Sequence, residues 1–465
     1  MKRVFLRTAI AVLALVVAAA AFTGCGSGNG GTGGTNSGSS GRRTSEGLKY
    51  TLAQDQQSYI VSGNNIKRST DVIIPSQYKK LPVSAIGDNA FKGNTVIKNV
   101  TVGSNVVSVG NNAFRSCTSL ESVVIPEGVK AIGDYAFGGC SALNAAELPA
   151  SLMTIGDYAF TGCRSLKAIN LPAGVAAIGE SAFSGCCEVE SMTVSEDNAV
   201  YIAKGDCIIE FASKTLVAGC KNSVIPDDGS VQIIAIEAFA ECVGLESITL
   251  PSGLTAISES AFAGCTGLKS VNIPASVTDI SVCAFEECAG LEEITAEEGN
   301  PRYQSAGNCL IETGTKTLVA GCKASVIPAD GSVEAIAEKA FSKCEGIVSL
   351  TVPGSVKQIG NYAFYNISSL ENIVLEEGVE RVGGCAFAAC PNLKTAKFPA
   401  SLKLIVAKCF FGCGSLSSVE FAKTDGWKTA SNASGSDGKT VSVGDPAAAA
   451  KALTGEHESS FWVNK

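Results

Sequence analysis

A phenylalanine that recurs at a constant interval constrains the fold of this chain more than any other feature. The twelve recurring positions are Phe91, Phe114, Phe137, Phe160, Phe183, Phe239, Phe262, Phe285, Phe341, Phe364, Phe387 and Phe410. Around each one the sequence follows the pattern Ile-Gly-x-x-Ala-Phe-x-x-Cys-x-x-Leu-x-x-Val-x-Ile-Pro, with some departures. A unit this short cannot bury its own apolar residues, so its copies must stack to make a core. The pattern therefore predicts a solenoid.

Each unit is expected to contain one short strand. Val123 and Ile125 alternate with outward-facing residues, which is typical of a strand with one buried face. Pro126 follows them, and a proline ends strand pairing because it has no N–H. Gly133 then marks a turn before the next Ala-Phe pair, which we expect to point into the core. Strands of successive units are predicted to pair in parallel, about 4.8 Å apart.

Two insertions of equal length interrupt the repeat. The separation between Phe183 and Phe239 exceeds two intervals of the repeat, and Phe285 and Phe341 are separated by the same amount. The insertions lie near 198–228 and 300–330, and each contains two short apolar runs around a polar centre. That pattern predicts a hairpin in each insertion.

Four cysteines accompany the predicted hairpins. If a two-residue turn is centred on residues 213–214, Cys207 lies directly opposite Cys220, and the same count places Cys309 opposite Cys322. These are sites where opposing side chains come closest in an antiparallel pair. Both cross-strand disulfides and buried free thiols fit this arrangement, and the sequence leaves the choice open.

The insertions also carry Tyr201, Tyr303 and Arg302, which are residue types that anchor protein interfaces. They are therefore candidate contact residues. The alternative is that each insertion is a spacer that packs flat on the solenoid. A second set of candidates lies on the outward face of the predicted strands, at Glu246, Lys269 and Glu292. This face is small, polar and mildly acidic, so it either binds an extended partner weakly or is simply solvated.

Ten cysteines stand three residues after the recurring phenylalanine, and Asn94 and Ile367 fill that position in the other two units. The isoleucine indicates that the position needs a compact apolar group, which favours a column of buried free thiols. An exported chain with many cysteines can also be a disulfide scaffold, but disulfide frameworks do not repeat at a constant interval. There is no Cys-x-x-Cys motif and one histidine, His457, so no metal site is predicted.

The N-terminus is predicted to be an export signal. Lys2, Arg3 and Arg7 precede an apolar run from residue 9 to 22, which suits a signal peptide over residues 1–24. The run ends in Phe22-Thr23-Gly24-Cys25, which resembles the lipobox of bacterial lipoproteins and implies lipidation at Cys25. An ordinary secretory signal with an accidental cysteine is the alternative. Residues 25–47 are then a lipid anchor and a Gly/Ser-rich tether, too polar to bury apolar area.

The repeat resembles the BspA-like class of leucine-rich repeats, which are bacterial and protist surface proteins. The resemblance covers residues 72–421 and includes the Ala-Phe-x-x-Cys signature. It implies a β-rich α/β solenoid, a right-handed leucine-rich-repeat superhelix with a parallel sheet on one face and short strands or helical turns on the other. Residues 48–81 would be the N-terminal cap, 82–421 the solenoid, and 422–465, with both tryptophans, a C-terminal cap or tail.

The same resemblance implies a lipid-anchored cell-surface or periplasmic protein that binds a host or microbial protein or a surface glycoconjugate. A structural cell-envelope protein without a dedicated ligand is the alternative, and a carboxylate-based carbohydrate-active enzyme is the least favoured. We expect a monomer with no enzymatic activity, no catalytic residue and no cofactor. The formal net charge of −8 argues against nucleic acid or an anionic bilayer surface as a partner, so membrane contact is expected through the N-terminal lipid only.

Overall fold

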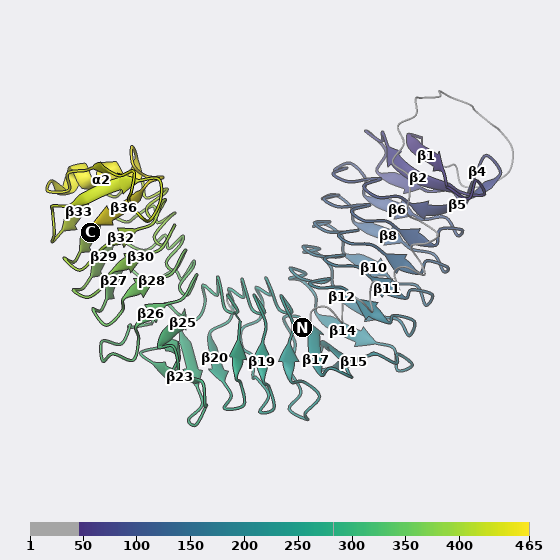
Figure 1. The fold of residues 1–465 in the computed structure, drawn as a ribbon. Coiled ribbons are helices and arrows are strands. Elements are labelled where there is room, and N and C mark those ends of the chain that lie inside the picture. Colours follow the sequence, from purple (N-terminus) through teal and green to yellow (C-terminus); the bar gives the residue numbers. More distant parts are fainter. Residues whose placement is uncertain (1–45, 282, 465) are drawn as a thin grey trace. The chain divides into compact units, whose positions relative to one another are not determined.

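The computed structural model describes residues 46–281 and 283–464. The predicted signal peptide, Cys25 and most of the tether lie outside these residues. The described residues form two compact units, unit 1 up to Ala212 and unit 2 from Ser213 onward. Within each unit the strands lie one above another in chain order (Figure 1). Stacked parallel strands with almost no helix make each unit a β-solenoid.

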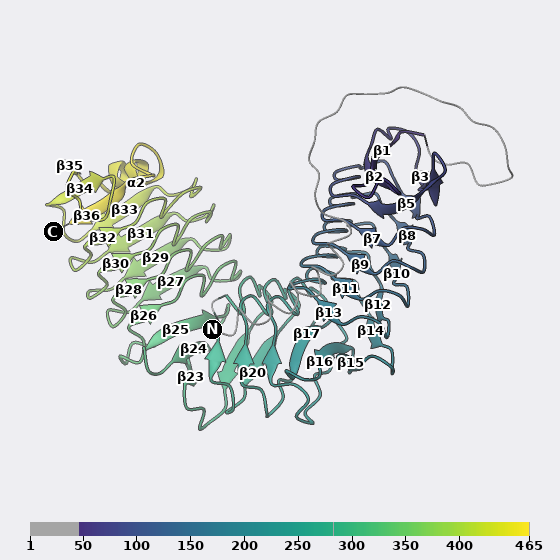
Figure 2. The same ribbon diagram turned by 45° about the vertical axis from the view of Figure 1, so that its right-hand side comes forward.

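Unit 1 contains two ladders of strands, which run side by side (Figure 2). One ladder contains β1 (Leu48–Leu52), β2 (Tyr59–Asn64), β5 (Leu81–Ile86), β7 (Ser108–Val109), β9 (Ala131–Ile132), β11 (Thr154–Ile155) and β13 (Ala177–Ile178), with β4 (Gln77–Tyr78) beside β5. The other side has β3 (Asp71–Ile73), β6 (Asn99–Thr101), β8 (Ser122–Val124) and β10 (Ala145–Glu147), followed by the pair β12 (Ala168–Leu171) and β14 (Ser191–Val194). The hairpin β15 (Tyr201–Lys204) and β16 (Cys207–Glu210) ends the unit. Val123 pairs in parallel with Val100 and Ala146, so the register shifts by one repeat from strand to strand.

Unit 2 continues the same plan. Its strands on one side are β17 (Thr215–Ala218), β18 (Ile233–Ile234), β19 (Ala256–Ile257), β21 (Asp279–Ile280), β23 (Tyr303–Ala306), β24 (Cys309–Glu312), β25 (Thr317–Gly321), β26 (Ala335–Ile336), β28 (Gln358–Ile359), β30 (Arg381–Val382) and β32 (Leu404–Ile405). The other side has the pair β20 (Ser270–Ile273) and β22 (Glu293–Ala296), and the four strands β27 (Ser349–Val352), β29 (Asn372–Leu375), β31 (Thr395–Phe398) and β33 (Ser418–Phe421). Strands β34 (Trp427–Ala430), β35 (Lys439–Thr440) and β36 (Phe461–Asn464) follow.

The C-terminal segment closes the last repeat of unit 2. Strand β36 pairs antiparallel with β32, and helix α2 (Pro446–Thr454) packs against β33. Trp427 and Trp462 are each 1% exposed, and their indole N–H groups donate to backbone oxygens of the same segment. Asp445 caps α2 by accepting two backbone N–H groups. Both tryptophans of the chain thus cover the end of the core.

Between the repeat strands of residues 46–281 and 283–464 there are no helical turns, and the second side holds short strands instead, which corrects the α/β part of our prediction. Among the described residues, α2 is the only α-helix. In all twelve units the residues two before and two after the phenylalanine have positive φ, as Tyr135 (φ 53°) and Gly139 (φ 74°) do around Phe137. A right-handed helix cannot continue through such residues. The backbone bonds to the next repeat instead, as in the N–H of Phe114 donating to Ala136 O at 2.7 Å. The right-handed superhelix stays a prediction.

The recurring phenylalanines form the centre of the core. Consecutive rings stack with centroids 4.8–5.7 Å apart, and ten of the twelve rings are at most 2% exposed. The inserts divide the rings into three stacks of five, three and four. Where an insert interrupts a stack, the rings of Phe239 and Phe341 lie on Gly219 and Gly321, and a Cβ at either glycine would be 2.0 Å from a ring carbon. These glycines therefore take the place of a missing phenylalanine. In the last unit Cys409 replaces the alanine and is also buried.

Gly133 has a different role from the turn that we predicted. A Cβ at Gly133 would lie 2.4 Å from Asn111 Oδ1 and 2.8 Å from the backbone nitrogen of Asn111 in the preceding repeat. Its φ is not in the positive range that favours glycine. The glycine is required because neighbouring repeats approach closely there.

In unit 1 a row of side chains links the repeats at this close approach. The row consists of Asp88, Asn111, Asp134, Asp157 and Glu180, one residue per repeat. Oδ1 of each of the first four accepts the backbone N–H of the next member over 2.8–3.0 Å. Partial burial raises the pKa of Asp134; the N–H of Asp157 lowers it in part, and the carboxylates of Asp157 and Asp88 raise it further. Asn111 makes the same bond without a charge.

We expect Asp134→Asn to stabilise unit 1 at neutral pH by about 0.5 kcal/mol or less, since the group is partly solvated. The pKa of Asp134 is raised in the folded state, so ionisation of its carboxyl lowers the free energy of unfolding as the pH rises through that pKa. Below the unfolded-state pKa the carboxyl is protonated in both states, and this loss of stability is absent. The variant should therefore unfold at higher urea concentration than wild type near pH 7, and at the same concentration in strong acid. A lower midpoint near pH 7 would show that the carboxylate is required.

Candidate recognition surface on the inserts

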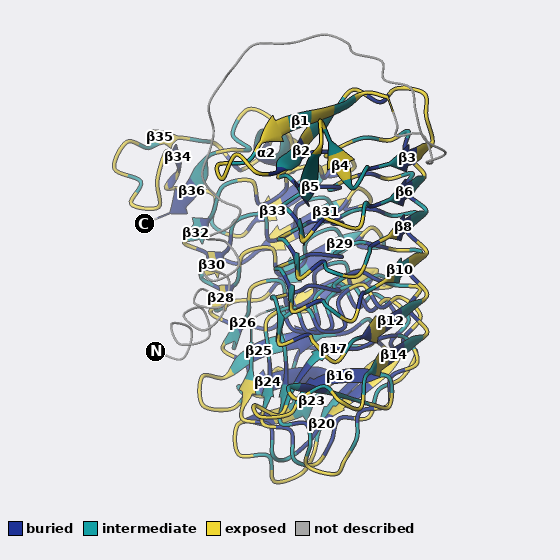
Figure 3. Ribbon diagram, turned by 90° about the vertical axis from the view of Figure 1, so that its right-hand side faces the viewer, coloured by how far each residue is buried: buried dark blue, intermediate teal, exposed yellow. Residues whose placement is uncertain are grey.

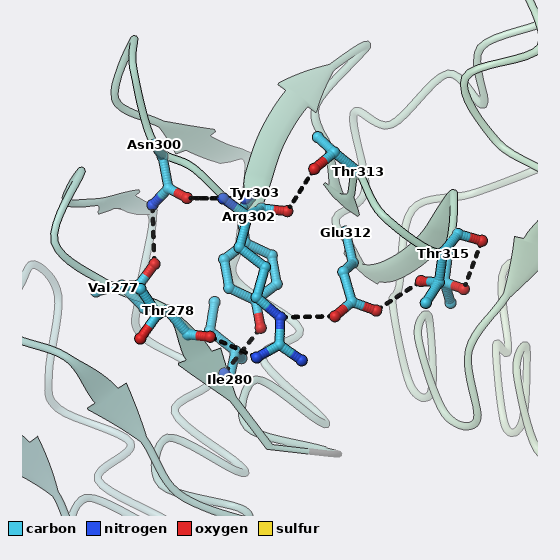
Figure 4. Close-up of polar contacts among 10 residues, drawn as sticks. Val277, Thr278, Ile280, Asn300, Arg302, Tyr303, Glu312, Thr313 and Thr315 are labelled. Atoms are coloured by element: carbon cyan, nitrogen blue, oxygen red, sulfur yellow. Dashed lines mark hydrogen bonds and ion pairs between the residues drawn. The ribbon is translucent and has the colours of Figure 1, made fainter.

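The second insert is packed against the repeat that precedes it. The Nδ2 atom of Asn300 donates to Pro274 O (2.8 Å) and Val277 O (3.1 Å), and its Oδ1 accepts the backbone N–H groups of Arg302 and Tyr303 (Figure 4). Strands β23, β24 and β25 then form an antiparallel meander, and β25 pairs in parallel with β26. The insert is therefore part of the sheet and not a projecting hairpin.

Two turns, not one, shape the insert. Gly307 (φ 57°) and Asn308 (φ 55°) connect β23 to β24, and both central residues of a type I′ turn need positive φ. Gly205 and Asp206 have the same conformation in the first insert. Our sequence analysis missed this turn, although a Gly-Asn or Gly-Asp pair between apolar runs is its usual signal. In the second insert the turn that we did predict holds four residues rather than two, because Glu312 pairs with Thr317.

The cysteine register also differs from the prediction. Cys309 pairs with Gly321 and not with Cys322, because the register shifts at a bulge between Leu310 and Ile311. Cys309 and Cys322 are free, buried thiols in the structure, and Cys207 and Cys220 are buried as well. The Sγ atom of Cys322 donates to Glu292 O at 3.1 Å, and burial raises the pKa of Cys309 to about 12. Disulfides between these pairs stay a prediction.

Tyr201 and Tyr303, which we proposed as contact residues, are buried. Their exposed fractions are 4% and 2%. The hydroxyl oxygen of Tyr303 accepts the backbone N–H of Ile280 at 2.9 Å, and that of Tyr201 accepts the N–H of Ile178 at 3.0 Å. Burial raises the pKa of Tyr201 to about 12. Both rings therefore fasten an insert to the strand before it and are not available to a partner.

Arg302 lies at the surface of the second insert. Its Nε donates to Glu312 Oε1 (2.7 Å), its Nη1 donates to Thr278 O (2.6 Å), and the guanidinium lies 5.8 Å from the ring centroid of Tyr303 (Figure 4). The bond to Glu312 raises the pKa of Arg302, and the bonds from Thr315 and then Arg302 lower the pKa of Glu312. Arg302 is thus half-exposed and held in one orientation by three groups.

The two inserts share a scaffold but differ in the side chains that they expose. Asn198 and Tyr201 repeat the contacts of Asn300 and Tyr303. In place of the pair formed by Arg302 and Thr313, the first insert has Val200 and Phe211. The backbone bond between the two positions is retained, from the N–H of Phe211 to Val200 O (3.0 Å) and from that of Thr313 to Arg302 O (2.9 Å).

Phe211 is 65% exposed, although it is a large apolar residue. Our sequence analysis did not single it out. Its exposure could have been predicted by aligning the two inserts, because Phe211 aligns with Thr313. A position that holds phenylalanine in one insert and threonine in the other does not belong to a core that both inserts share. Phe211 and Arg302 are among the side chains that distinguish the two insert surfaces, as are Lys204 and Gln304.

The predicted residues of the sheet face follow one column. Glu246, Lys269 and Glu292 are exposed and occupy the same position in three consecutive repeats. Glu292 Oε1 pairs with Lys323 Nζ at 2.7 Å, and this bond lowers the pKa of Glu292. Other repeats have similar exposed ion pairs, including Lys98 with Glu121 (2.7 Å) and Lys394 with Glu371 (2.9 Å). Such pairs contribute little to stability. Many charged side chains on this face nevertheless form ion pairs with other side chains of the solenoid.

Comparison with known proteins identifies the repeat. A family model described as the BspA type leucine-rich repeat region, in six copies, matches residues 70–204, 218–313 and 315–426. The chain belongs to this family. A search of curated proteins found no match.

Several solved bacterial structures resemble this BspA-type chain. A leucine-rich repeat protein from Eubacterium ventriosum is 24% identical, with a TM-score of 0.53, and the match covers 74% of this chain and 93% of that one. It supports the fold. A leucine rich cell surface protein from Faecalibacterium prausnitzii is 25% identical over 83% of this chain and 96% of that one, with a TM-score of 0.47. A leucine-rich repeat protein from Bacteroides ovatus is 26% identical over 82% and 100%, with a TM-score of 0.44.

The cysteine of the BspA-type repeat has a definite partner in this structure. In eight of the ten units in the described part of the chain, its Sγ atom donates to the backbone oxygen of the phenylalanine one repeat earlier, over 3.0–3.4 Å. Cys265, for example, is fully buried and bonds to Phe239 O at 3.1 Å. Burial raises the pKa of Cys265, so it remains a thiol and keeps the proton that it donates. Eight members of this column are free thiols in the structure: Cys117, Cys140, Cys163, Cys265, Cys288, Cys344, Cys390 and Cys413.

No hollow of ligand size accompanies the surface. The two best-defined hollows in residues 46–281 and 283–464 each have a volume of about 10 Å³, which is room for about one water molecule. Within the same residues, no group of three or more metal-ligating side chains comes together, and no helix is long and apolar enough to span a membrane.

Proposed function

We propose that this BspA-type chain is an exported, lipid-anchored surface protein that binds a protein or a surface glycoconjugate through the exposed side chains of its inserts. The observation that carries the proposal is the difference between the two inserts. Asparagine and tyrosine fasten both in the same way, whereas the exposed side chains include Phe211 in one and Arg302 in the other. A spacer needs the fastening residues alone. Exposed phenylalanine and arginine on a rigid support are instead typical of a contact surface.

The proposal of export and anchoring is supported by the N-terminal sequence. A basic start, an apolar run and a cysteine follow one another in the order of a bacterial lipoprotein signal. No catalytic role is proposed, because the acidic residues of the sheet face recur by repeat position and take part in surface ion pairs.

Replacing the predicted lipid attachment residue should release the protein. In the bacterium, Cys25→Ala is expected to move the chain from the detergent phase to the aqueous phase of a Triton X-114 extraction, because the acyl chains can no longer be attached. Cys187→Ala, which changes a partly exposed cysteine of unit 1, is the control and should leave the partitioning unchanged. Retention of the Cys25 variant in the detergent phase would refute lipid anchoring at this residue.

The insert surface can be tested by giving one insert the residue of the other. Phe211→Thr should weaken binding of the purified chain to immobilised matrix proteins or to intact cells by about tenfold or more, as expected for a contact residue. Phe411→Thr removes a comparably exposed phenylalanine (52%) outside the inserts and should have no effect. Equal binding by wild type and Phe211→Thr would mean that the first insert is a spacer. Equal losses from both variants would mean that exposed apolar area, and not the insert, causes the binding.

A further inference from the structure

The N-terminal cap differs in charge from the rest of the chain. Residues 48–81 contain five basic and two acidic side chains, whereas residues 82–465 contain 26 basic and 41 acidic ones. The basic side chains are Lys49, Lys67, Arg68, Lys79 and Lys80, and all five are exposed. The net charge of the whole chain, on which we based our exclusion of an anionic surface, concealed this difference. The cap therefore has a positive net charge, whereas the rest of the chain has a negative one.

The basic side chains of the cap are also not neutralised by the protein. Within the described residues none of the five takes part in an ion pair, while lysines further along the chain pair with glutamates, as Lys98 does with Glu121 at 2.7 Å. An unpaired cation at the surface keeps its full attraction for an external anion. A lysine that forms an ion pair with a glutamate, in contrast, attracts an external anion weakly.

Two of these lysines occupy a position that lysine disfavours. Lys79 (φ 49°) and Lys80 (φ 69°) form the two-residue turn between β4 and β5, where Tyr78 pairs with Leu81. Such turns strongly prefer Asn-Gly, because both residues have positive φ. Lysine at both positions is strained, and strain of this kind concentrates at functional sites. The turn presents two adjacent ammonium groups at the surface of the cap.

Aromatic and apolar residues accompany the charges. The rings of Tyr50 and Tyr78 stack at 3.9 Å, Tyr59 lies edge-on to Tyr78 at 5.0 Å, and Lys79 Nζ is 5.4 Å from the Tyr78 ring. All three tyrosines are partly exposed, and Leu52 in β1 is 42% exposed. Figure 3 shows β1 and β4 as exposed strands at the end of unit 1. Tyrosine is enriched where proteins meet the boundary between a bilayer and water.

We propose that the N-terminal cap, defined by Lys49, Lys67, Arg68, Lys79, Lys80 and the three tyrosines, binds the anionic phospholipid surface of a bilayer. The complementary charges of the cap and of an anionic bilayer support this proposal. The position of the cap, close to Cys25 in the sequence, supports it as well. In the sequence, about 20 residues separate Cys25 from the cap. A lipid at Cys25 would therefore hold the cap close to the membrane. That orientation rests on the proposed anchoring, but the binding of the cap itself does not. A lipid chain combined with a basic patch anchors more stably than either alone.

The test uses residues 26–465, which retain every described residue and lack the predicted signal and Cys25. Wild type should float with vesicles of phosphatidylcholine and phosphatidylglycerol, should not float with phosphatidylcholine alone, and should be released by salt. Lys79→Asn combined with Lys80→Gly supplies the preferred turn residues, so the fold is retained while two charges are lost. Binding should fall by about 25-fold, at about fivefold for each lysine. The control, Lys394→Gln with Lys403→Gln, removes two charges that are paired in unit 2 and should leave binding unchanged.

Three results would overturn the proposal. The first is no flotation with anionic vesicles at low salt. The second is an equal loss in the cap and control variants, which would indicate a nonspecific effect of net charge. The third is binding to a soluble anionic polymer, such as lipoteichoic acid freed of its lipid, without binding to vesicles. Because the assay contains neither the lipid anchor nor a protein partner, its failure is separate from failure of the proposed function.

Discussion

Phe262→Ala is expected to lower the free energy of unfolding by about 3–5 kcal/mol, through lost burial and the cavity left behind. The Phe262 ring is fully buried and stacks between Phe239 at 5.1 Å and Phe285 at 5.5 Å. Because repeats lean mainly on their neighbours, the damage should concentrate in the adjacent repeats. Hydrogen exchange should therefore speed up most in strands β19 and β21.

Phe411→Ala is the matched control for this prediction. Phe411 directly follows the recurring Phe410, yet it is 52% exposed. Its removal should change stability by about 0.5 kcal/mol or less, as for most surface substitutions. A Phe262 variant with the denaturation midpoint of wild type would mean that the recurring phenylalanines are not the core.

Gly321→Ala should destabilise unit 2 although it adds a single methyl group. The new Cβ would lie 2.0 Å from Cε1 and 2.3 Å from Cζ of Phe341, so the ring at the start of the last stack would have to move. Overpacking of this kind costs about 1–3 kcal/mol, and occasionally more.

Gly314→Ala is the control in the same insert, since a Cβ there has no atom within 4 Å. It should leave the melting temperature close to that of wild type or raise it slightly, because alanine restricts the unfolded chain. Similar melting temperatures for the Gly314 and Gly321 variants would show that Phe341 does not rest on the insert.

The repeated parts of the molecule were predictable from sequence because each signal occurs many times. The column of Phe262 and its equivalents recurs in constant register, and a proline follows several of the strands, so stacking and burial followed directly. The backbone between the strands was not predictable in this way. Positive φ occurs there at residues as different as Tyr135 and Lys339, and side-chain identity does not reveal it.

The inserts were predicted less well because their side chains act across repeats. Tyr303 resembles a surface anchor in sequence, but its hydroxyl bonds to Ile280, which lies one repeat earlier. Cys309 and Cys322 appeared to be opposite because a bulge cannot be counted from residue spacing. Phe211 required comparison of two distant segments, and the basic cap required charge to be counted by segment.

We propose that this solenoid is displayed outside the cell, where its inserts can meet a partner. A membrane-impermeant biotin ester applied to intact bacteria tests it most directly, since many lysines, including Lys130 and Lys269, are exposed. We expect the chain to be labelled in intact cells to nearly the extent found after lysis, while a cytoplasmic marker protein stays unlabelled. Labelling of the chain that appears after lysis alone would contradict display at the surface.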